Sequence, residues 1–370
     1  MKLIDEFRDP VLARRLVDSI RQLATQRWTI MEVCGGQTHG LLRHGIDQEL
    51  SDVVELLHGP GCPVCVTPAE SIDRAIELAL RPGVLLTTFG DMLRVPGTGR
   101  SLMQAQAEGA KTRMVYSPLD AVKLAQEFPT TEVVFFAVGF ETTAPATALA
   151  VSQAAALGLK NFSVLMAHVR VLPAMEAIAQ APECRVQGFL AAGHVCTVTG
   201  YDAYRDFSQQ YRLPIVVTGF EPVDLLDGLH RCVQLLEQGS CEVINAYGRS
   251  VRVAGNLPAL EILREVFEIH DQAWRGLGVM PRGGYSLAPA YRAYDATTRF
   301  SWQANHAPLT DPCPSGEVMS GRIRPTQCPH FGTRCTPQTP LGAPMVSTEG
   351  ACNAYVRYSQ HTPLSDSNQK

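Results

Sequence analysis

The sequence predicts an α/β fold in which two parallel-sheet βαβ domains face a cleft and a third domain is mainly helical and irregular. Short apolar segments without polar alternation recur along the first 220 residues, which is typical of strands buried on both faces of a parallel sheet. Helical patterns lie between these segments, as expected for right-handed βαβ units. The 370 residues are also more than one hydrophobic core usually supports.

In order along the chain, an amphipathic helix is expected over residues 10–26, ahead of the first strand. The strand candidates are short apolar segments at 28–33, 53–57, 84–88, 113–116, 133–138, 162–166, 187–190 and 214–218. The intervening segments with the clearest helical spacing are 69–80, 119–127 and 144–156.

The pattern changes after about residue 220. Residues 222–238 and 257–274 have the apolar spacing of long helices, and the chain beyond about residue 276 is rich in Gly, Pro, Arg and Tyr. The change divides the chain into three expected domains, at 28–118, at 119–220, and at 1–27 combined with 221–370.

Composition and charge argue against several classes of function. With 45% hydrophobic and 18% charged residues, the chain is typical of a soluble globular protein. The formal net charge of −4, without any run of Lys and Arg, argues against a nucleic-acid partner. The N-terminal stretch is interrupted by charged residues, and no segment approaches the ~20 apolar residues of a membrane span. A cytoplasmic protein without a membrane partner is therefore expected.

Polar residues follow two of the predicted strands directly. Glu141, Thr142 and Thr143 come after one strand, and His194 comes after another. The carboxyl ends of parallel strands meet at one edge of the sheet, where such folds bind ligands. Glu141 and His194 are therefore candidate catalytic groups, and Thr142 and Thr143 are candidates for hydrogen bonds around them. The alternatives are helix capping by the threonines and a purely structural role for the histidine.

Four cysteines lie in a C-terminal stretch with little periodicity, at Cys313, Cys328, Cys335 and Cys352. Such a stretch cannot bury much apolar surface by itself, so a metal centre would stabilise it. The spacings of 14, 6 and 16 residues lack the close CxxC pairs of zinc ribbons, whereas thiolates from separated loops can enclose a [4Fe–4S] cluster. Spacing alone leaves zinc, a cluster and unrelated free thiols open, and it favours a cluster.

Cys62 and Cys65 form a CxxC motif where a glycine-rich loop is expected to enter a helix. Backbone N–H groups at a helix start favour a thiolate, and a CxxC pair can make and break a disulfide in a two-electron reaction. The alternative is half of a zinc site, but the sequence has no second CxxC to complete one. A redox pair is therefore favoured.

Cys34 stands alone after the first predicted strand, followed by Gly35 and Gly36 and close to His39. Paired glycines allow a ligand to approach the backbone closely. A single cysteine is more often a buried apolar residue. This setting instead indicates an exposed thiolate that binds a soft metal or acts as a nucleophile, with His39 as a supporting group.

Several motifs match one known family, namely EVCGGQTH at 32–39, HGPGCPVC at 58–65, FFAVGFETTAP at 135–145, AAGHV at 191–195, VTGFEPVDLL at 217–226 and NAYGRSVRVAGN at 245–256. Together with the Cx14Cx6Cx16C pattern, they make the chain resemble the HypD hydrogenase maturation proteins from about residue 28 to Cys352. Gln37 stands where some members carry histidine, so the resemblance assigns it no metal or proton-transfer role.

The resemblance implies a scaffold, rather than a turnover enzyme, on which the Fe(CN)2CO group of [NiFe]-hydrogenase is assembled. The implied partners are the small chaperone HypC and the cyanide donor HypE. By position, Cys34 would bind Fe(II), carrying CN and CO as transient cargo, together with the N-terminal cysteine of HypC. Cys62 and Cys65 would be the redox pair, and the four C-terminal cysteines would hold a [4Fe–4S] cluster in the third domain.

Two other functions stay open on the residues alone. One is an iron–sulfur dithiol oxidoreductase that uses Cys62 and Cys65 on a small molecule. The other is a zinc-stapled interaction module without a redox role.

Overall fold

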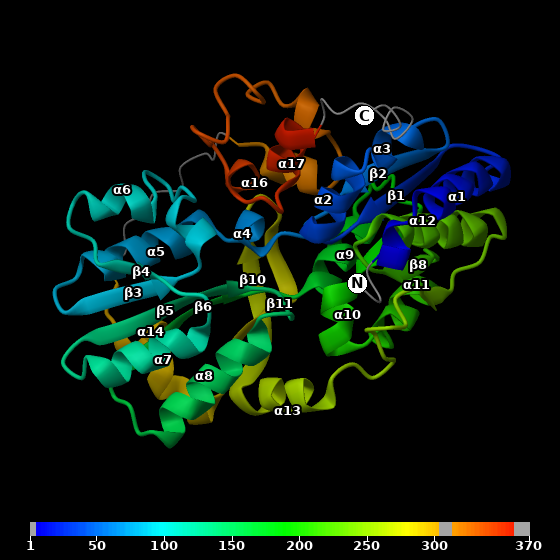
Figure 1. The fold of residues 1–370 in the computed structure, drawn as a ribbon. Coiled ribbons are helices and arrows are strands. Elements are labelled where there is room, and N and C mark those ends of the chain that lie inside the picture. Colours follow the sequence, from blue (N-terminus) through cyan, green and yellow to red (C-terminus); the bar gives the residue numbers. More distant parts are fainter. Residues whose placement is uncertain (1–4, 303–312, 359–370) are drawn as a thin grey trace.

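The computed structural model describes residues 5–302 and 313–358, and within them it contains two parallel β-sheets, which confirms the α/β prediction (Figure 1). In this part of the chain, the first sheet has five strands in the order β2-β1-β7-β8-β9, and the second has four in the order β4-β3-β5-β6. Figure 1 shows the antiparallel pair β10-β11 between the sheets and the orange and red C-terminal segment across their junction.

The five-stranded sheet is built from β1 (Trp28–Glu32), β2 (Val54–His58), β7 (Gly188–Ala192), β8 (Ile215–Thr218) and β9 (Val243–Asn245). All of its strand pairs are parallel. Helices α1 (Pro10–Leu23) and α12 (Pro222–Glu237) bury apolar side chains against one face. Helices α9 (Val171–Gln180) and α11 (Ala203–Tyr211) do so on the other face. Burial on both faces explains why these strands lack polar alternation.

The four-stranded sheet is built from β3 (Val84–Thr88), β4 (Thr112–Met114), β5 (Glu132–Gly139) and β6 (Phe162–His168), again all parallel. Helices α5 (Ala69–Leu80) and α6 (Leu102–Gln106) contribute to the apolar cluster on one face. Helices α7 (Pro118–Glu127) and α8 (Ala144–Ala156) contribute to the cluster on the other. The bounds of β3, α5 and α8 are those predicted from the sequence.

The two sheets do not follow the expected ranges 28–118 and 119–220. After β2 the chain leaves the first sheet, builds the whole second sheet with β3 to β6, and then returns with β7 to β9. Each expected range therefore contains strands of both sheets. Apolar periodicity identifies a strand but not its partner, because pairing depends on contacts between segments far apart in the chain.

The predicted helix at 257–274 is wrong over its second half. Helix α13 (Leu257–Val266) ends at Val266, and the extended residue Phe267 begins β10 (Phe267–Trp274) directly. This strand pairs antiparallel with β11 (Gly278–Leu287). Pairing with this later strand fixes the extended conformation of residues 267–274. The local spacing of apolar residues does not indicate that pairing.

The C-terminal segment is largely irregular, as predicted. Its regular elements are short: α15 (Ser315–Met319), a 3-10 helix at Pro325–Gln327, α16 (Ala343–Val346) and α17 (Ala351–Tyr358). Helix α17 packs against α2 (Gly35–Arg43) through Leu42, Ala354 and Tyr355. Among the described residues, no helix combines the length and the apolar character needed to cross a membrane.

Candidate functional site

A cleft of about 460 Å³ opens where the carboxyl ends of strands from both sheets approach each other. Cys34, after β1, and His194, after β7, line it from the first sheet. Thr142 and Thr143, after β5, line it from the second. The C-terminal segment closes one side with Glu349. The predicted cleft between the two sheets is therefore present. Four of the candidates from the sequence line it, namely Cys34, Thr142, Thr143 and His194.

Cys34 is held by its backbone at the start of α2. Its N–H donates to Glu32 Oε2 at 2.8 Å, and the N–H of the next residue, Gly35, donates to the Gly61 carbonyl at 3.0 Å. Burial and the nearby carboxylates of Glu32 and Glu349 raise the pKa of the Cys34 thiol to about 12. The expectation of an exposed thiolate is wrong, because the thiol is only partly exposed and keeps its proton near neutral pH.

Cys62 and Cys65 form a disulfide, with their Cα atoms 5.3 Å apart. Cys62 caps α4 (Pro63–Val66), a short helix that precedes α5, and its sulfur accepts the Cys65 N–H at 3.3 Å. Both cysteines are buried in an apolar cluster against which Cys34 packs. The cleft itself is lined by Pro63 of the same loop. The predicted redox pair is thus buried next to the part of the cleft lining that contains Cys34.

The other candidates divide into two groups. His194 lines the cleft and stacks on Phe220 with ring centroids 3.8 Å apart, and burial lowers its pKa. Glu141 does not line the cleft. It is buried and accepts the Val171 N–H at 3.1 Å, and burial raises its pKa to about 7. His39 points to the C-terminal segment, where its Nε2 lies 3.2 Å from the Tyr358 hydroxyl.

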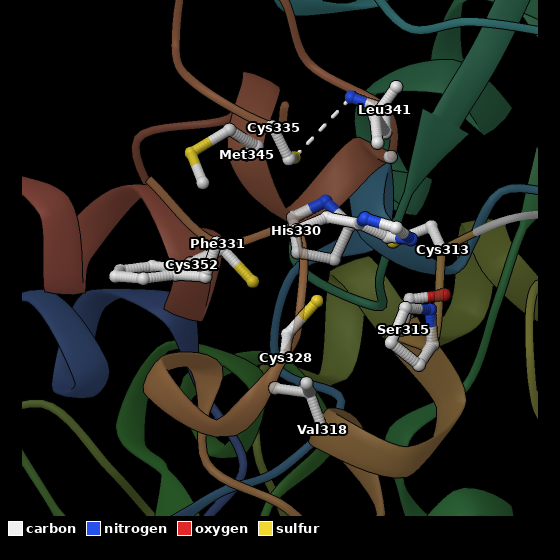
Figure 2. A pocket seen from close by; sticks show the side chains of 13 residues that line it. Cys313, Ser315, Val318, Cys328, His330, Phe331, Cys335, Leu341, Met345 and Cys352 are labelled. Carbon is white, nitrogen blue, oxygen red and sulfur yellow. Dashed lines mark hydrogen bonds between the residues drawn. The ribbon is translucent and has the colours of Figure 1, made fainter. Parts of the chain in front are cut away.

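The four C-terminal cysteines line one cavity (Figure 2). Figure 2 shows the sulfurs of Cys328 and Cys352 pointing into it, and Phe331 and Met345 give it apolar walls. Cys335 Sγ accepts the Leu341 N–H at 3.4 Å. Burial, followed by the charges of the other three cysteines, raises the pKa of Cys352, so all four lie within electrostatic reach.

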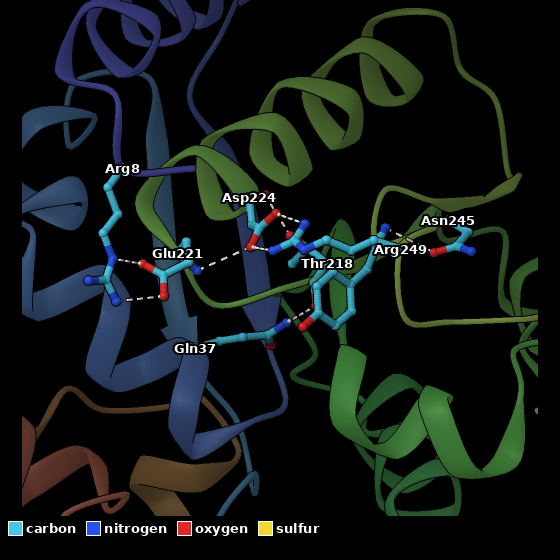
Figure 3. Close-up of polar contacts among 8 residues, drawn as sticks. Arg8, Gln37, Thr218, Glu221, Asp224, Asn245 and Arg249 are labelled. Carbon is cyan, nitrogen blue, oxygen red and sulfur yellow. Dashed lines mark hydrogen bonds and ion pairs between the residues drawn. The ribbon is translucent and has the colours of Figure 1, made fainter. Parts of the chain in front are cut away.

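Gln37 has a structural part in holding the site (Figure 3). It is fully buried, and its Nε2 donates to the Ala191 carbonyl at 3.0 Å and to the Thr218 carbonyl at 3.4 Å. These carbonyls belong to β7 and β8. Gln37 therefore fixes α2, the helix that starts at Cys34, to the two neighbouring strands.

Sequence reasoning missed a buried polar chain behind Cys34. Glu32 accepts His58 Nδ1 at 2.8 Å, and His58 Nε2 lies 3.3 Å from the Tyr355 hydroxyl. A charged residue and a histidine at the carboxyl ends of two buried, mainly apolar strands were a signal for Glu32 and His58. No comparable signal marked Tyr355 or Glu349, because both lie in the segment without periodicity.

The fold and the site together define a class of α/β protein with one cysteine in a cleft between two parallel sheets and a separate cavity lined by four cysteines. A sequence model described as "HypD: Hydrogenase formation hypA family" matches residues 11–359. The chain belongs to the HypD family of hydrogenase maturation factors.

Curated relatives agree over nearly their whole length. The hydrogenase maturation factor HypD of Azotobacter vinelandii is 48% identical over 369 residues, covering 97% of both chains. HypD of Escherichia coli K12 is 45% identical, covering 97% of this chain and 99% of that protein. HypD of Cupriavidus necator is 42% identical, covering 97% and 98%.

Proposed function

We propose that this hydrogenase maturation factor is the scaffold on which the Fe(CN)2CO group of [NiFe]-hydrogenase is assembled, in complex with a HypC-type chaperone in the cytoplasm. The observation that carries the proposal is the convergence of three kinds of cysteine. Cys34 lies in the cleft, the Cys62–Cys65 pair lies behind its wall, and the segment that closes the cleft continues into the four-cysteine cavity.

Cys34 is the proposed iron ligand of this chain. Thiolate is a strong donor to a soft or low-spin iron ion, and only the deprotonated sulfur binds. Because the Cys34 thiol holds its proton at neutral pH, iron binding releases one proton as the Fe–S bond forms. Burial and the charge of Asp91 raise the pKa of Glu349, which also lines the cleft, so its carboxylate is a suitable acceptor for that proton.

Cys62 and Cys65 are the proposed two-electron donor. A thiocyanate presented by a HypE-type partner yields cyanide by the reaction R–SCN + 2 e⁻ + H⁺ → R–SH + CN⁻. The dithiol supplies both electrons as it closes to the disulfide, and it releases two protons. The disulfide in the structure corresponds to the oxidised form of the pair.

The four thiols around one apolar cavity fit a [4Fe–4S] cluster, which would be held by Cys313, Cys328, Cys335 and Cys352. When bound, such a cluster supplies electrons one at a time. The residues of this chain prepare the place for it: Phe331 and Met345 keep water away, and the Leu341 N–H provides a hydrogen bond to a sulfur ligand.

The experiment that tests the proposal is infrared spectroscopy of the complex purified anaerobically with its HypC-type partner, combined with iron and zinc analysis. Stretching bands of CN and CO, together with iron and a visible cluster absorption, are expected. A colourless protein that contains zinc contradicts the cluster and supports a zinc-stapled interaction module. Steady turnover of a small disulfide or dithiol substrate without any partner supports a dithiol oxidoreductase instead.

A further inference from the structure

The backbone of Cys34 depends on a buried carboxylate. Glu32 is completely buried, and its Oε2 accepts the Cys34 N–H at 2.8 Å. Its Oε1 accepts hydrogen bonds from the Thr38 hydroxyl and from His58 Nδ1. A buried carboxylate is tolerated only with such partners, so each of them helps to fix the position of the others. The Cys34 loop is thereby tied to His58 at the end of β2.

His58 continues this connection to the C-terminal segment. Its Nε2 lies 3.3 Å from the hydroxyl of Tyr355, and the two rings meet edge to face with centroids 5.4 Å apart. Tyr355 lies on α17, three residues after Cys352, so both side chains project from one face of the helix. Cys352 lines the four-cysteine cavity. One helix therefore carries a cavity cysteine and a contact to the buried chain behind Cys34.

Two further contacts connect the C-terminal segment to the region around Cys34. The backbone of Glu349 packs against Gly35, the residue after Cys34, so closely that a Cβ at position 35 would overlap it. At the other end of α17, the Tyr358 hydroxyl lies 3.2 Å from His39 Nε2 on α2. The segment that supplies Cys352 thus contacts the Cys34 loop and the helix that follows it.

We propose that Glu32, His58 and Tyr355 are positioning residues that couple the four-cysteine cavity to Cys34, so that occupation of the cavity fixes the Cys34 loop for iron. Binding at Cys352 fixes the first turn of α17 in place. The contacts from Tyr355 to His58 and from His58 to Glu32 then hold the Cys34 amide in position as well. The cavity then has a second role besides electron supply: it sets the order of assembly, cluster before iron. This inference rests on the proposed function for the cluster in the cavity and for Cys34 as the iron ligand, whereas the coupling itself can be measured without iron at Cys34.

The test measures how fast iodoacetamide alkylates Cys34 in the full-length chain, with the cluster present and after its removal by a chelator. Trypsin releases residues 28–43 as one peptide in which Cys34 is the single cysteine, so mass spectrometry follows this thiol alone. In the wild-type chain, cluster loading is expected to slow alkylation about 5-fold or more, the lower end of typical coupling between sites. In Tyr355→Phe, which keeps the ring but loses the hydroxyl, the difference is expected to fall below about 2-fold.

The matched control is Tyr294→Phe, which removes another tyrosine hydroxyl, one that lies 3.4 Å from the Ala154 carbonyl, away from this chain of contacts. It should behave as the wild type. Cluster absorption confirms loading of each variant. If Tyr355→Phe fails to load, His58→Asn gives the same readout, because asparagine keeps a donor toward Glu32 but is too short to reach Tyr355.

Equal protection of Cys34 by the cluster in the wild type and in these variants overturns the coupling. So does a loaded wild-type chain whose Cys34 is not protected, and in that case the proposed function still stands. A wild-type chain that takes up no cluster contradicts the proposed function and this inference together.

Discussion

Gly61 lies against the backbone of Cys34, so closely that a Cβ atom at position 61 would overlap the Cys34 nitrogen and Cα. Gly61 directly precedes Cys62, the first cysteine of the disulfide. The loop of the redox pair and the loop of the cleft cysteine therefore share a backbone contact without a side chain between them. Because protein interiors are close-packed, displacing one of these loops displaces the other.

Replacing Gly61 with alanine should push these two loops apart. We expect Gly61→Ala to lower the free energy of unfolding by about 1–3 kcal/mol, as overpacking does, and to weaken the CN and CO infrared bands of the complex. Gly99→Ala is the matched control, since Gly99 is exposed and a Cβ there meets no atom within 4 Å. Denaturant unfolding of both variants measures the difference, and equal stabilities would show that the contact is not tight.

Cys34 should be indispensable for iron but not for the cluster. We expect Cys34→Ala to abolish the CN and CO bands while the visible cluster absorption persists, because the four cavity cysteines are unchanged. Cys184→Ala removes another partly exposed cysteine and should leave both signals as they are. Bands that survive in Cys34→Ala would remove Cys34 as the iron ligand.

Cys328 should be indispensable for the cluster. In Cys328→Ala we expect at most residual visible absorption and a lower iron content, and we expect α17 to become accessible to proteases because its anchor at Cys352 is weakened. Cys241→Ala, a partly exposed cysteine outside the cavity, is the control. Full absorption and unchanged iron content in Cys328→Ala would contradict the assignment of the cavity.

Glu141 should make stability depend on pH between about 4.5 and 7. Burial raises its pKa from 4.5 to about 7, so the folded chain holds this proton more tightly than the unfolded chain does. Its contribution to stability is complete below pH 4.5 and is lost as the pH rises through 7. At 1.36 kcal/mol per pKa unit, the loss is on the order of 3 kcal/mol.

Glu141→Gln stays neutral and can still accept the Val171 N–H, so it should be more stable than the wild type at pH 8 and similar to it at pH 4. Denaturant unfolding at several pH values checks this, with Glu127→Gln on the exposed end of α7 as the control. Glu141→Gln should also keep the CN and CO bands. Loss of the bands in a folded variant would instead support the catalytic role expected from the sequence.

The parts of the fold that could be predicted are those whose signal is local. The apolar run of β3 and the helical segments α5 and α8 are visible in the sequence because the signal for each lies within one continuous segment. Strand partners could not be predicted in this way. Residues 267–274 have an apolar spacing that also suits a helix, and only the pairing with β11 makes them a strand.

The candidate site shows the same division. Cysteines are rare and chemically distinctive, so Cys34, the CxxC pair and the C-terminal set could be named from type and spacing. The prediction for Glu141 placed it at the cleft because it follows β5, but its side chain turns toward the start of α9. Side-chain direction after a strand depends on the next turn of backbone, which periodicity does not describe. Tyr355 and Glu349 could be recognised as part of the site only from their contacts in the structure.

The way the chain returns to its first sheet bears on synthesis at the ribosome. Ile30 of β1 pairs with Gly188 of β7, a separation of 158 residues. At translation rates of about 5–20 residues per second, Cys34 leaves the ribosome roughly 8–30 s before the strand that seats β1 in the sheet. During that interval the nascent chain carries an unprotected thiol. His194, which lines the cleft beside Cys34, follows the same late strand, so the site around Cys34 is incomplete until β7 has been made. A chaperone that shields this thiol early would find it already accessible.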